Sequence, residues 1–360
     1  MVVDVASLGL FILDTFEWRT VSEDGTATTT KRDEGIIGGG GTYAVIGSRI
    51  WLPAGRVGIL VDRGYDWPAD LDAQLDAYGS DMWVFREQPQ YPTTRALNLY
   101  TSEHREFEYL SHRTRLEPKD LPPPLRTAQY LHFVCSPTRA LEITAQLRPE
   151  HNSTPEWQPR LVYEPIPDRC RPDEMGPLRK VLPSIAVFSP NHEEAWAFFG
   201  VSAADANARG RPGVEIVARK FLEEGAADLV VIRSGPMGAY ALRRSGGEEE
   251  EVGDEVGFWV PAYHSYETGK STGKVVDVTG AGNSFLGGLM AGLVLYPDDL
   301  PTAVRCGAVS ASFVIEQFAL PTLTEDADGI ERWNGVRPAD RLAQLQALPA
   351  PVGSASDVHS

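Results

Sequence analysis

The sequence has few cysteines, no long apolar run and no excess of basic charge, and each of these shortages argues against a class of protein. Its three cysteines are widely spaced and odd in number, so we expect buried free thiols in a reducing compartment rather than a disulfide framework or a Cys-x-x-Cys metal site. No apolar segment reaches the roughly 18 residues of a membrane-spanning helix, and the N-terminus lacks the basic start of a secretory signal. A soluble, cytoplasmic protein is therefore expected.

Acidic residues outnumber basic residues by 50 to 33, which gives a formal charge of −17. An acidic surface repels nucleic acids and anionic membranes, so we expect neither as a partner. The chain also lacks the G-x-G-x-x-G spacing of a dinucleotide site, which argues against a nicotinamide-dependent enzyme. With 360 residues, 42% of them hydrophobic, it can bury a sizeable core, and we expect one main domain with an appendage.

The strongest chemical signal lies at residues 275–292, V-V-D-V-T-G-A-G-N-S-F-L-G-G-L-M-A-G. The valines of residues 275–278 predict a short strand, the glycines a tight turn, and the apolar spacing that follows, up to Leu295, a helix. Gly280 and Gly282 have no Cβ, so their N–H groups can converge at the positive start of this helix, which suits a phosphate or a developing anion. A turn that only lets the helix pack closely on a sheet is the alternative.

This segment resembles the D-T-x-G-A-G-D signature of the ribokinase-like, or PfkB-type, carbohydrate kinases. Asp277 matches the first aspartate, and the resemblance places Asp277 and Thr279 beside the nucleotide. The family's anion hole for the transferred phosphate is matched by Gly280, Ala281 and Gly282. At the last position the family has the aspartate that takes a proton from the substrate hydroxyl. Here that position is Asn283, whose amide has no basic lone pair to accept it.

Residues 2–13 predict a first buried strand that ends at Asp14, and a carboxylate at such a strand end lies at the ligand edge of an open α/β sheet. The family carries G-x-x-x-x-D here, matched by Gly9 and Asp14, and the resemblance implies that Asp14 binds substrate hydroxyls. A simple turn cap is the alternative. Hairpins are predicted at residues 15–37, around Asp24-Gly25, and at residues 92–112. In the family such strands form a lid over the sugar.

A second glycine turn, at residues 38–41, opens a helix and is similar to the family's G-G-x-x-x-N substrate turn. The resemblance implies that Gly39 and Gly40 approach a sugar, although Ala44 stands where the family has its asparagine. A flexible hinge is the alternative. For Arg95, in the second hairpin, a salt bridge on the sheet is favoured over contact with a substrate anion.

Further strands are predicted at residues 57–61, 129–135, 160–164, 185–188 and 229–232, and helices at residues 66–78 and 301–318. Asn191 can cap the helix that follows the strand at 185–188. The N-x-x-E pattern of Asn191 and Glu194 also resembles the family motif that organises magnesium and phosphate through water. A capped helix without metal would need the same residues.

The strand at residues 229–232 is followed by Gly235 and Gly238, which look like the family's glycine turn beside the nucleotide. Arg233, at the start of this turn, is a candidate phosphate contact. The helix at 301–318 is rich in small residues, among them Gly307, and in relatives the equivalent helix packs one face on adenine. Packing within the core would select the same small residues, so both interpretations stay open.

The motifs follow one another in the family's order, so the chain is identified as an α/β ribokinase-like protein in three layers, with a mostly parallel central sheet and a small β-lid. It is also similar to the fungal killer-virus-maintenance-like branch of that family. We expect one kinase domain at residues 1–345 and a C-terminal tail at residues 346–360 that is partly disordered. The resemblance implies ATP and Mg²⁺, with a monovalent cation as a further cofactor, and allows a homodimer formed through the lid.

Two functions remain open. The first is ATP- and magnesium-dependent phosphorylation of a small sugar or related alcohol, because phosphoryl transfer depends mainly on positioning and charge neutralisation. The second is an inactive pseudokinase that binds nucleotide or sugar and acts through a protein partner. The phosphate and magnesium motifs favour the kinase, whereas Asn283 favours the pseudokinase. For an active enzyme, Asp14 and Asp277 are the carboxylates considered as a substitute base.

Overall fold

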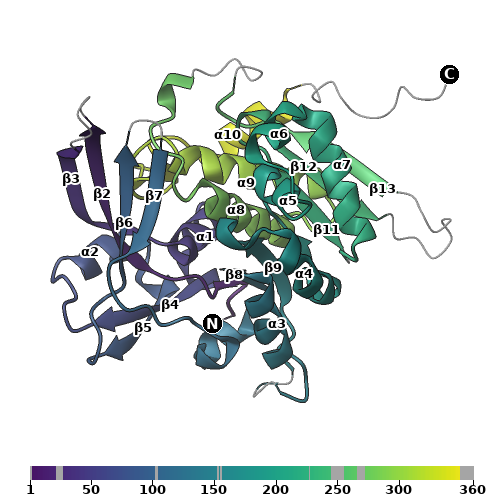
Figure 1. Ribbon diagram of the computed structural model, residues 1–360. Coiled ribbons are helices and arrows are strands. Elements are labelled where there is room, and N and C mark those ends of the chain that lie inside the picture. The colour runs from purple at the N-terminus through teal and green to yellow at the C-terminus, as the bar shows by residue number, and fades with distance from the viewer. Residues whose placement is uncertain are drawn as a thin grey trace, which may run out of the picture.

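The body of the molecule is a nine-stranded sheet, and a separate four-stranded sheet stands beside it in the computed structural model (Figure 1). The structure describes residues 2–21, 27–101, 104–151, 154, 156–226, 228–244, 255–265 and 272–348. In order across the large sheet, the strands are β13 (Glu255–Val260), β12 (Ala239–Arg244), β11 (Leu229–Arg233), β10 (Val187–Phe188), β9 (Arg160–Pro165), β8 (Tyr130–Cys135), β1 (Val5–Ser7), β4 (Val57–Gly64) and β5 (Trp83–Gln88). The strands from β11 to β5 run parallel, and β12 and β13 are antiparallel.

The large sheet is buried on both faces, which explains the continuous apolar runs of its strands. In β11, Val231 packs into the core on one face, while Val230 and Ile232 pack into the core on the other. Successive side chains of a strand point to opposite faces, so a strand covered on both sides needs apolar residues at every position.

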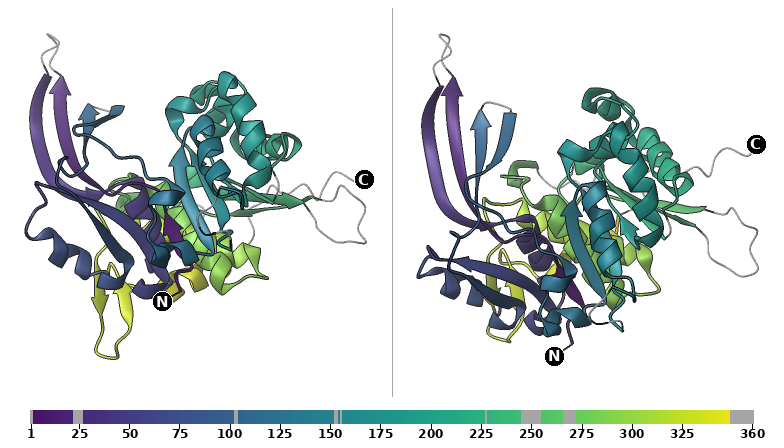
Figure 2. Two further views of the ribbon diagram at one scale, coloured as in Figure 1. Left: turned by 90° about the horizontal axis from the view of Figure 1, so that it is seen from below. Right: turned by 60° about the horizontal axis from the view of Figure 1, so that its bottom comes forward.

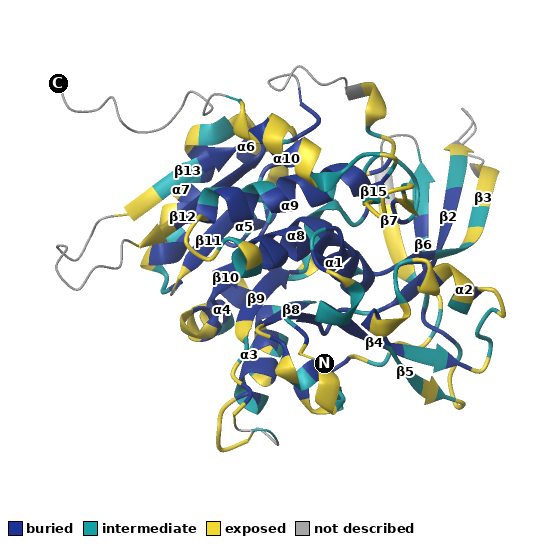
Figure 3. Ribbon diagram, turned by 180° about the vertical axis from the view of Figure 1, so that it is seen from behind, coloured by how far each residue is buried: buried dark blue, intermediate teal, exposed yellow. Residues whose placement is uncertain are grey.

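Helices form the two outer layers. One layer consists of α1 (Gly40–Arg49), α2 (Leu71–Asp76), α8 (Ala281–Leu295), α9 (Leu300–Val314) and α10 (Pro338–Gln346). The other consists of α3 (Pro137–Gln146), α4 (Met175–Val181), α5 (His192–Ala197), α6 (Ala203–Ala208) and α7 (Gly210–Glu223). A short hairpin, β14 (Leu323–Glu325) and β15 (Glu331–Trp333), lies between α9 and α10 in sequence. Helices α1, α8 and α9 are largely buried (Figure 3).

Helix α8 lies between α1 and α9 and contacts both through its backbone. A Cβ at Gly287 would lie 1.9 Å from the carbonyl oxygen of Ala44 in α1. A Cβ at Gly288 would lie 2.5 Å from the carbonyl oxygen of Cys306 in α9. Larger residues at these positions would force the helices apart. This close packing holds the start of α8, and the glycine turn before it, in a defined place.

The small sheet contains, in order, β3 (Ala27–Gly38), β2 (Ile12–Val21), β6 (Arg95–Thr101) and β7 (His104–Tyr109), and it projects from the body (Figure 2). The antiparallel pairs β2–β3 and β6–β7 confirm both predicted hairpins. The predicted Asp24-Gly25 turn lies outside the described residues. On this sheet the rings of Trp18 and Tyr100 stack with their centroids 5.6 Å apart. Trp18 also meets Phe318 of the body edge-on at 5.2 Å, which ties the sheet to the body.

The prediction of one strand over residues 2–13 is wrong. Strand β1 ends at Ser7 and β2 begins at Ile12, so the chain leaves the large sheet, turns and enters the small one. Glycine is required at position 9 of this turn, because the Cβ of any other residue would lie 2.5 Å from the backbone nitrogen of Gly41 and would clash with it. Asp14 therefore lies near the start of β2 rather than at the end of a central strand.

The strand predicted at residues 275–278 does not form either. Val276 and Val278 are 50% and 62% exposed, and a preference for β structure does not make a strand where no neighbouring strand can pair. The helix predicted at 66–78 is shortened to α2. Asp66, the first residue of the predicted helix, instead accepts a hydrogen bond from the backbone nitrogen of Thr93. It also forms a salt bridge with Arg95 at 2.9 Å, which is the interaction favoured for Arg95 from the sequence.

All three cysteines are buried free thiols, as expected. Burial raises the pKa of Cys135 and Cys306 to about 12, so both stay protonated and unreactive. Of the predicted tail, residues 349–360 lie outside the described part of the chain. None of the described helices is long and apolar enough to cross a membrane.

Candidate active site

The glycine turn at residues 280–283 separates two cavities of about 510 and 500 Å³. The first cavity is lined from both sheets, with Glu164 at the end of β9 and with Asn98, Phe107 and Tyr109 of the small sheet. The second cavity is lined by the turn after β11 and by one face of α9. Asn191 borders both. The turn is therefore the place where a group in one cavity can reach a group in the other.

The three residues predicted to bind substrate, Asp14, Gly39 and Gly40, all line the first cavity. Asp14 is only 3% exposed. Its carboxylate lies against Gly38, where a Cβ would be 2.0 Å from Oδ2. Gly39 has φ +96°, in the left-handed region, and precedes α1 as its N-cap. The second glycine turn thus forms part of the wall of the cavity.

In the first glycine turn, Gly280 adopts φ +78° and is the N-cap of α8. A Cβ at this position would also lie 2.3 Å from the ring of Tyr43. As a glycine, Gly280 provides no side-chain cap, and within the described residues the Ala281 nitrogen donates to the carbonyl oxygen of Val278 at 3.2 Å. The start of α8 is the positive end of the helix dipole. The anion hole formed by Gly280, Ala281 and Gly282 stays a prediction, which the positive start of α8 favours.

Asn283 lies in the first turn of α8 and faces the first cavity. With its amide nitrogen turned toward its acceptors, it donates to the carbonyl oxygen of Gly40 at 3.1 Å and to Oε2 of Glu164 at 3.3 Å. Glu164 is therefore the carboxylate that lies beside the position of the family's base. Asp277 does not line either cavity.

Glu164 is buried, at 7% exposure, and paired. Its Oε1 lies 2.8 Å from Nη2 of Arg233, and its Oε2 lies 3.8 Å from Nε2 of His132. Burial by itself would raise the pKa of Glu164, but the charge of Arg233 and the contact with His132 hold it below its ordinary value. Glu194, which is less closely paired, shows the opposite shift: burial raises its pKa to about 7. Glu164 is thus the ionised member of the two near neutral pH.

The predicted magnesium residues, Asn191 and Glu194, form a capping box at the start of α5. The Asn191 side chain accepts from the Glu194 nitrogen at 2.8 Å, and the Glu194 carboxylate accepts from the Asn191 nitrogen at 2.7 Å. The guanidinium of Arg233 lies between Glu164 and Glu194, 2.8 and 3.6 Å away. Within the described residues, no three His, Cys, Asp or Glu side chains are grouped to hold a metal. These residues fit a divalent cation poorly, because an arginine already neutralises the carboxylates.

The predicted nucleotide residues divide into two groups. Gly235 and Gly238 line the second cavity. Thr279 lines the first cavity instead, and Asp277 acts as a structural anchor: its Oδ1 accepts from the Thr279 nitrogen and hydroxyl and from the Tyr100 hydroxyl at 3.2, 3.0 and 3.1 Å. This contact links the turn to the small sheet.

Gly307 does not line the second cavity. A Cβ at Gly307 would lie 2.8 Å from the carbonyl oxygen of Phe285, so this glycine serves the packing of α9 against α8. The small residues of α9 that do face the cavity are Ala308, Ala311 and Ser312. The core-packing interpretation therefore holds for Gly307, and its neighbours on the helix form the cavity wall.

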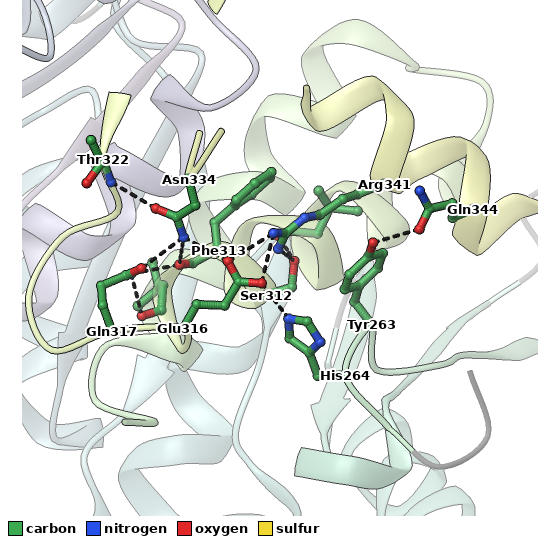
Figure 4. Close-up of polar contacts among 12 residues, drawn as sticks. Tyr263, His264, Ser312, Phe313, Glu316, Gln317, Thr322, Asn334, Arg341 and Gln344 are labelled. Atoms are coloured by element: carbon green, nitrogen blue, oxygen red, sulfur yellow. Dashed lines mark hydrogen bonds and ion pairs between the residues drawn. The ribbon is translucent and has the colours of Figure 1, made fainter. Parts of the chain in front are cut away.

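A network of polar side chains is centred on Glu316 (Figure 4), and its members His264 and Ser312 line the second cavity. The Glu316 carboxylate accepts from Arg341 at 2.8 Å and from Asn334 at 2.8 Å, and lies 2.9 Å from Nε2 of His264. The four residues come from the end of α9, the hairpin, α10 and the segment after β13. Burial opposes ionisation, but these hydrogen bonds lower the pKa of Glu316 to about 2. The network therefore holds the C-terminal elements against the cavity wall.

Replacing Glu316 by glutamine is expected to destabilise the fold by about 3 kcal/mol at neutral pH, because it leaves buried Arg341 without its counter-charge. Since the folded-state pKa lies below the ordinary value of 4.5, the stabilisation is present above that pH and is lost as the pH falls toward about 2. The free energies of unfolding of wild type and variant, measured by urea denaturation, should converge on going from pH 7 to pH 3. A constant difference across this range would contradict the assignment.

Glu164 is not among the site residues predicted from the sequence, although a signal was present. Glu164 ends the strand predicted at residues 160–164, and the argument applied to Asp14, a carboxylate at the ligand edge of the sheet, applies to it equally. Three arginines at the first cavity were not predicted either, because they lie in the loop after β7 and on α3 and have no local pattern: Arg113, Arg115 and Arg139.

A parallel sheet between two helical layers, a second sheet over one cavity and a glycine turn between two cavities define a ribokinase-like protein. The chain belongs to the pfkB family of carbohydrate kinases, whose model matches residues 71–326. Both the fold class and the family predicted from the sequence motifs and their order are thus confirmed.

Two relatives similar over nearly the full length are fungal proteins. The chain is 29% identical over 352 residues to an uncharacterized protein of Schizosaccharomyces pombe, covering 95% of this chain and 92% of the relative. It is 29% identical over 355 residues to protein MAK32 of Saccharomyces cerevisiae, covering 94% and 90%. The predicted kinship with the fungal branch is confirmed. Among solved structures, Arabidopsis thaliana ribokinase complexed with ribose and ATP has a TM-score of 0.61 at 14% identity, covering 96% of this chain and 99% of that one, which shows the fold.

Proposed function

We propose that the protein transfers the terminal phosphoryl group of ATP to a hydroxyl of a small carbohydrate or related alcohol. The observation that carries this proposal is the position of the uncapped start of α8 between two cavities of similar volume. An electron-poor helix start at such a junction stabilises a phosphoryl group in passage from one bound molecule to the other. The family membership and the ribose and ATP of the Arabidopsis ribokinase structure support the same assignment.

The first cavity takes the hydroxylated substrate. Asp14 is placed to accept hydrogen bonds from hydroxyl groups, and Gly39 and Gly40 allow a ligand close to the backbone. The small sheet acts as the lid, since Asn98, Phe107 and Tyr109 complete the cavity. The three arginines that also line it give an acidic protein a local basic region, so substrates with a phosphate or carboxylate belong in the search. A dimer formed through the small sheet stays a prediction.

The second cavity takes the nucleotide. Its walls are mainly apolar, with Ala308, Ala311 and Ile315 on one side and the glycines after β11 on the other, which suits the flat face of a nucleobase. Arg233 and Gly282 lie at the end of this cavity next to the turn. A nucleotide with its base at α9 would direct its phosphates there.

In the proposed reaction, the substrate hydroxyl oxygen bonds to the terminal phosphorus while the bond between that phosphorus and the bridging oxygen of ADP breaks. The hydroxyl proton passes to Glu164, the ionised carboxylate beside Asn283. Asn283 donates one hydrogen bond to Glu164 and so keeps the carboxylate near the acceptor position. The N–H groups at the start of α8 and the guanidinium of Arg233 face the developing negative charge.

A pseudokinase that binds nucleotide or sugar and acts through a protein partner is the second candidate. It is favoured by Asn283 itself, and by the pairing of Glu164 with Arg233, which makes that carboxylate a weaker base. Binding in both cavities without turnover would support this candidate.

A thermal-shift screen tests the assignment. ATP, ADP and a panel of neutral and anionic sugars, nucleosides and polyols are added singly and in pairs. A ligand present at about 100 times its Kd stabilises the folded state by about 2.7 kcal/mol and raises the unfolding midpoint, whether or not turnover occurs. We expect a shift with nucleotides and with one class of sugar. No shift with any nucleotide at millimolar concentration would refute the proposal.

A further inference from the structure

We propose that Arg233 is a resident cation of the phosphate site, and that it lets the protein bind the phosphates of a nucleotide without a divalent metal ion. The inference rests on the nucleotide binding proposed above. It starts from the poor fit of a metal to Glu164 and Glu194, whose charges face a guanidinium rather than open space.

The position of Arg233 is fixed by the fold. It is the last residue of β11, and its backbone nitrogen donates to the carbonyl oxygen of Pro190 at 3.1 Å. Its Nη2 donates to the carbonyl oxygen of Ser189 at 3.0 Å and pairs with Glu164 at 2.8 Å. The side chain is 13% exposed. Such a charge is not a mobile surface group, because each of these contacts would be lost if the side chain swung out.

The same guanidinium lies against the glycine turn. A Cβ at Gly282 would be 1.8 Å from Nη1 of Arg233, so the absence of a side chain at Gly282 creates the space that Nη1 occupies. Arg233 and Gly282 both line the second cavity. Its Nε is buried and has no hydrogen-bond acceptor within the described part of the chain. Through Nη1, a fixed cation therefore stands next to the helix start that would receive an anion.

An arginine in this place can replace much of what a divalent ion supplies. Magnesium needs oxygen ligands and keeps several waters, whereas here the carboxylates that would orient those waters are paired with Arg233. A second cation brought between them would also be repelled by the guanidinium. The planar fork of an arginine matches a phosphate and makes charge-assisted hydrogen bonds to it.

Calorimetry with ADP and a non-hydrolysable ATP analogue, in EDTA and in excess Mg²⁺, tests the inference on the unmodified protein. We expect the two Kd values to agree within about threefold, a difference of about 0.6 kcal/mol. Binding that appears only with Mg²⁺ would overturn the inference and leave the proposed function intact. No binding in either condition would refute both.

Variants of Arg233 test the inference further by the same calorimetry. Arg233→Met should weaken binding in EDTA by roughly 10- to 100-fold, the loss of one or two charge-assisted hydrogen bonds, and Mg²⁺ should restore part of it. Arg233→Lys keeps the positive charge but lacks the planar set of N–H donors, so its affinity in EDTA should lie between those of wild type and Arg233→Met. Because Arg233→Met leaves the buried carboxylate of Glu164 without its counter-charge, the double variant Arg233→Met, Glu164→Gln is also measured. Thermal unfolding checks that both proteins are folded. Arg219→Met, at a surface pair with Glu255, is the control and should bind like wild type. Equal affinities of wild type and both Arg233 variants in EDTA would also overturn the inference.

Discussion

Replacing Glu164 by glutamine is expected to lower turnover by roughly 10²- to 10⁴-fold, the usual contribution of a general base. Glutamine keeps the shape and one acceptor oxygen for Arg233, so substrate binding should change little, whereas the lost counter-charge of Arg233 should lower the stability of the fold. The loss should appear in kcat rather than KM, because the proton moves only in the transition state. The measurement is steady-state ADP formation with the sugar that the thermal screen selects.

Asn283→Asp is the variant to compare with Glu164→Gln, because it adds a carboxylate beside Glu164. From the sequence alone, this change would be expected to restore the family's base and raise turnover. The structure argues otherwise, because the new carboxylate would face the carbonyl oxygen of Gly40 and the carboxylate of Glu164, both hydrogen-bond acceptors. Two like charges at this distance cannot both ionise easily, so the single variant should be less stable and no more active.

The double variant Asn283→Asp, Glu164→Gln exchanges the two groups and restores a carboxylate on α8 with an amide beside it. It should regain most of the activity that Glu164→Gln loses. A large gain from Asn283→Asp alone, together with full activity of Glu164→Gln, would show that Glu164 is not the base. Absence of turnover in wild type and in both variants, with ligand binding retained, would favour the pseudokinase.

Gly282→Leu is expected to abolish nucleotide binding, with at least a roughly 100-fold loss of affinity, while the protein stays folded. Even a Cβ at this position would lie 1.8 Å from Nη1 of Arg233 and 3.1 Å from Oε1 of Glu164. The leucine must therefore displace the guanidinium and fill the space beside the helix start. Gly282 does not have a positive φ, and leucine is a good helix former, so the backbone can accept the change.

Calorimetric titration with ADP measures this loss, and circular dichroism reports the fold. Gly176→Leu is the matched control: it also places leucine in the first turn of a helix, α4, but a Cβ there meets nothing within 4 Å. The control should bind nucleotide like wild type. A folded Gly282→Leu protein with unchanged affinity would show that nucleotide does not bind at this turn.

Much of the fold could be predicted because its signals are local. The strands at residues 129–135 and 229–232 and the helix at 301–318 appear as β8, β11 and α9 within a few residues. The prediction was wrong where distant contacts decide. Residues 275–278 have the composition of a strand but pair with no strand of the described chain, and residues 2–13 are divided between two sheets.

The amino-acid sequence by itself determined the family, the glycine turn and the asparagine at position 283 where the family motif has aspartate, because these depend on residues adjacent in the chain. Tertiary structure alone decided which charged groups lie beside Asn283 and the glycine turn. Glu164 at the end of β9 meets Asn283 of α8, and Arg233 at the end of β11 meets Gly282, only because parallel strands bring their carboxyl ends to one edge of the sheet and α8 packs across it. Charge pairing between such distant residues leaves no local pattern in the sequence.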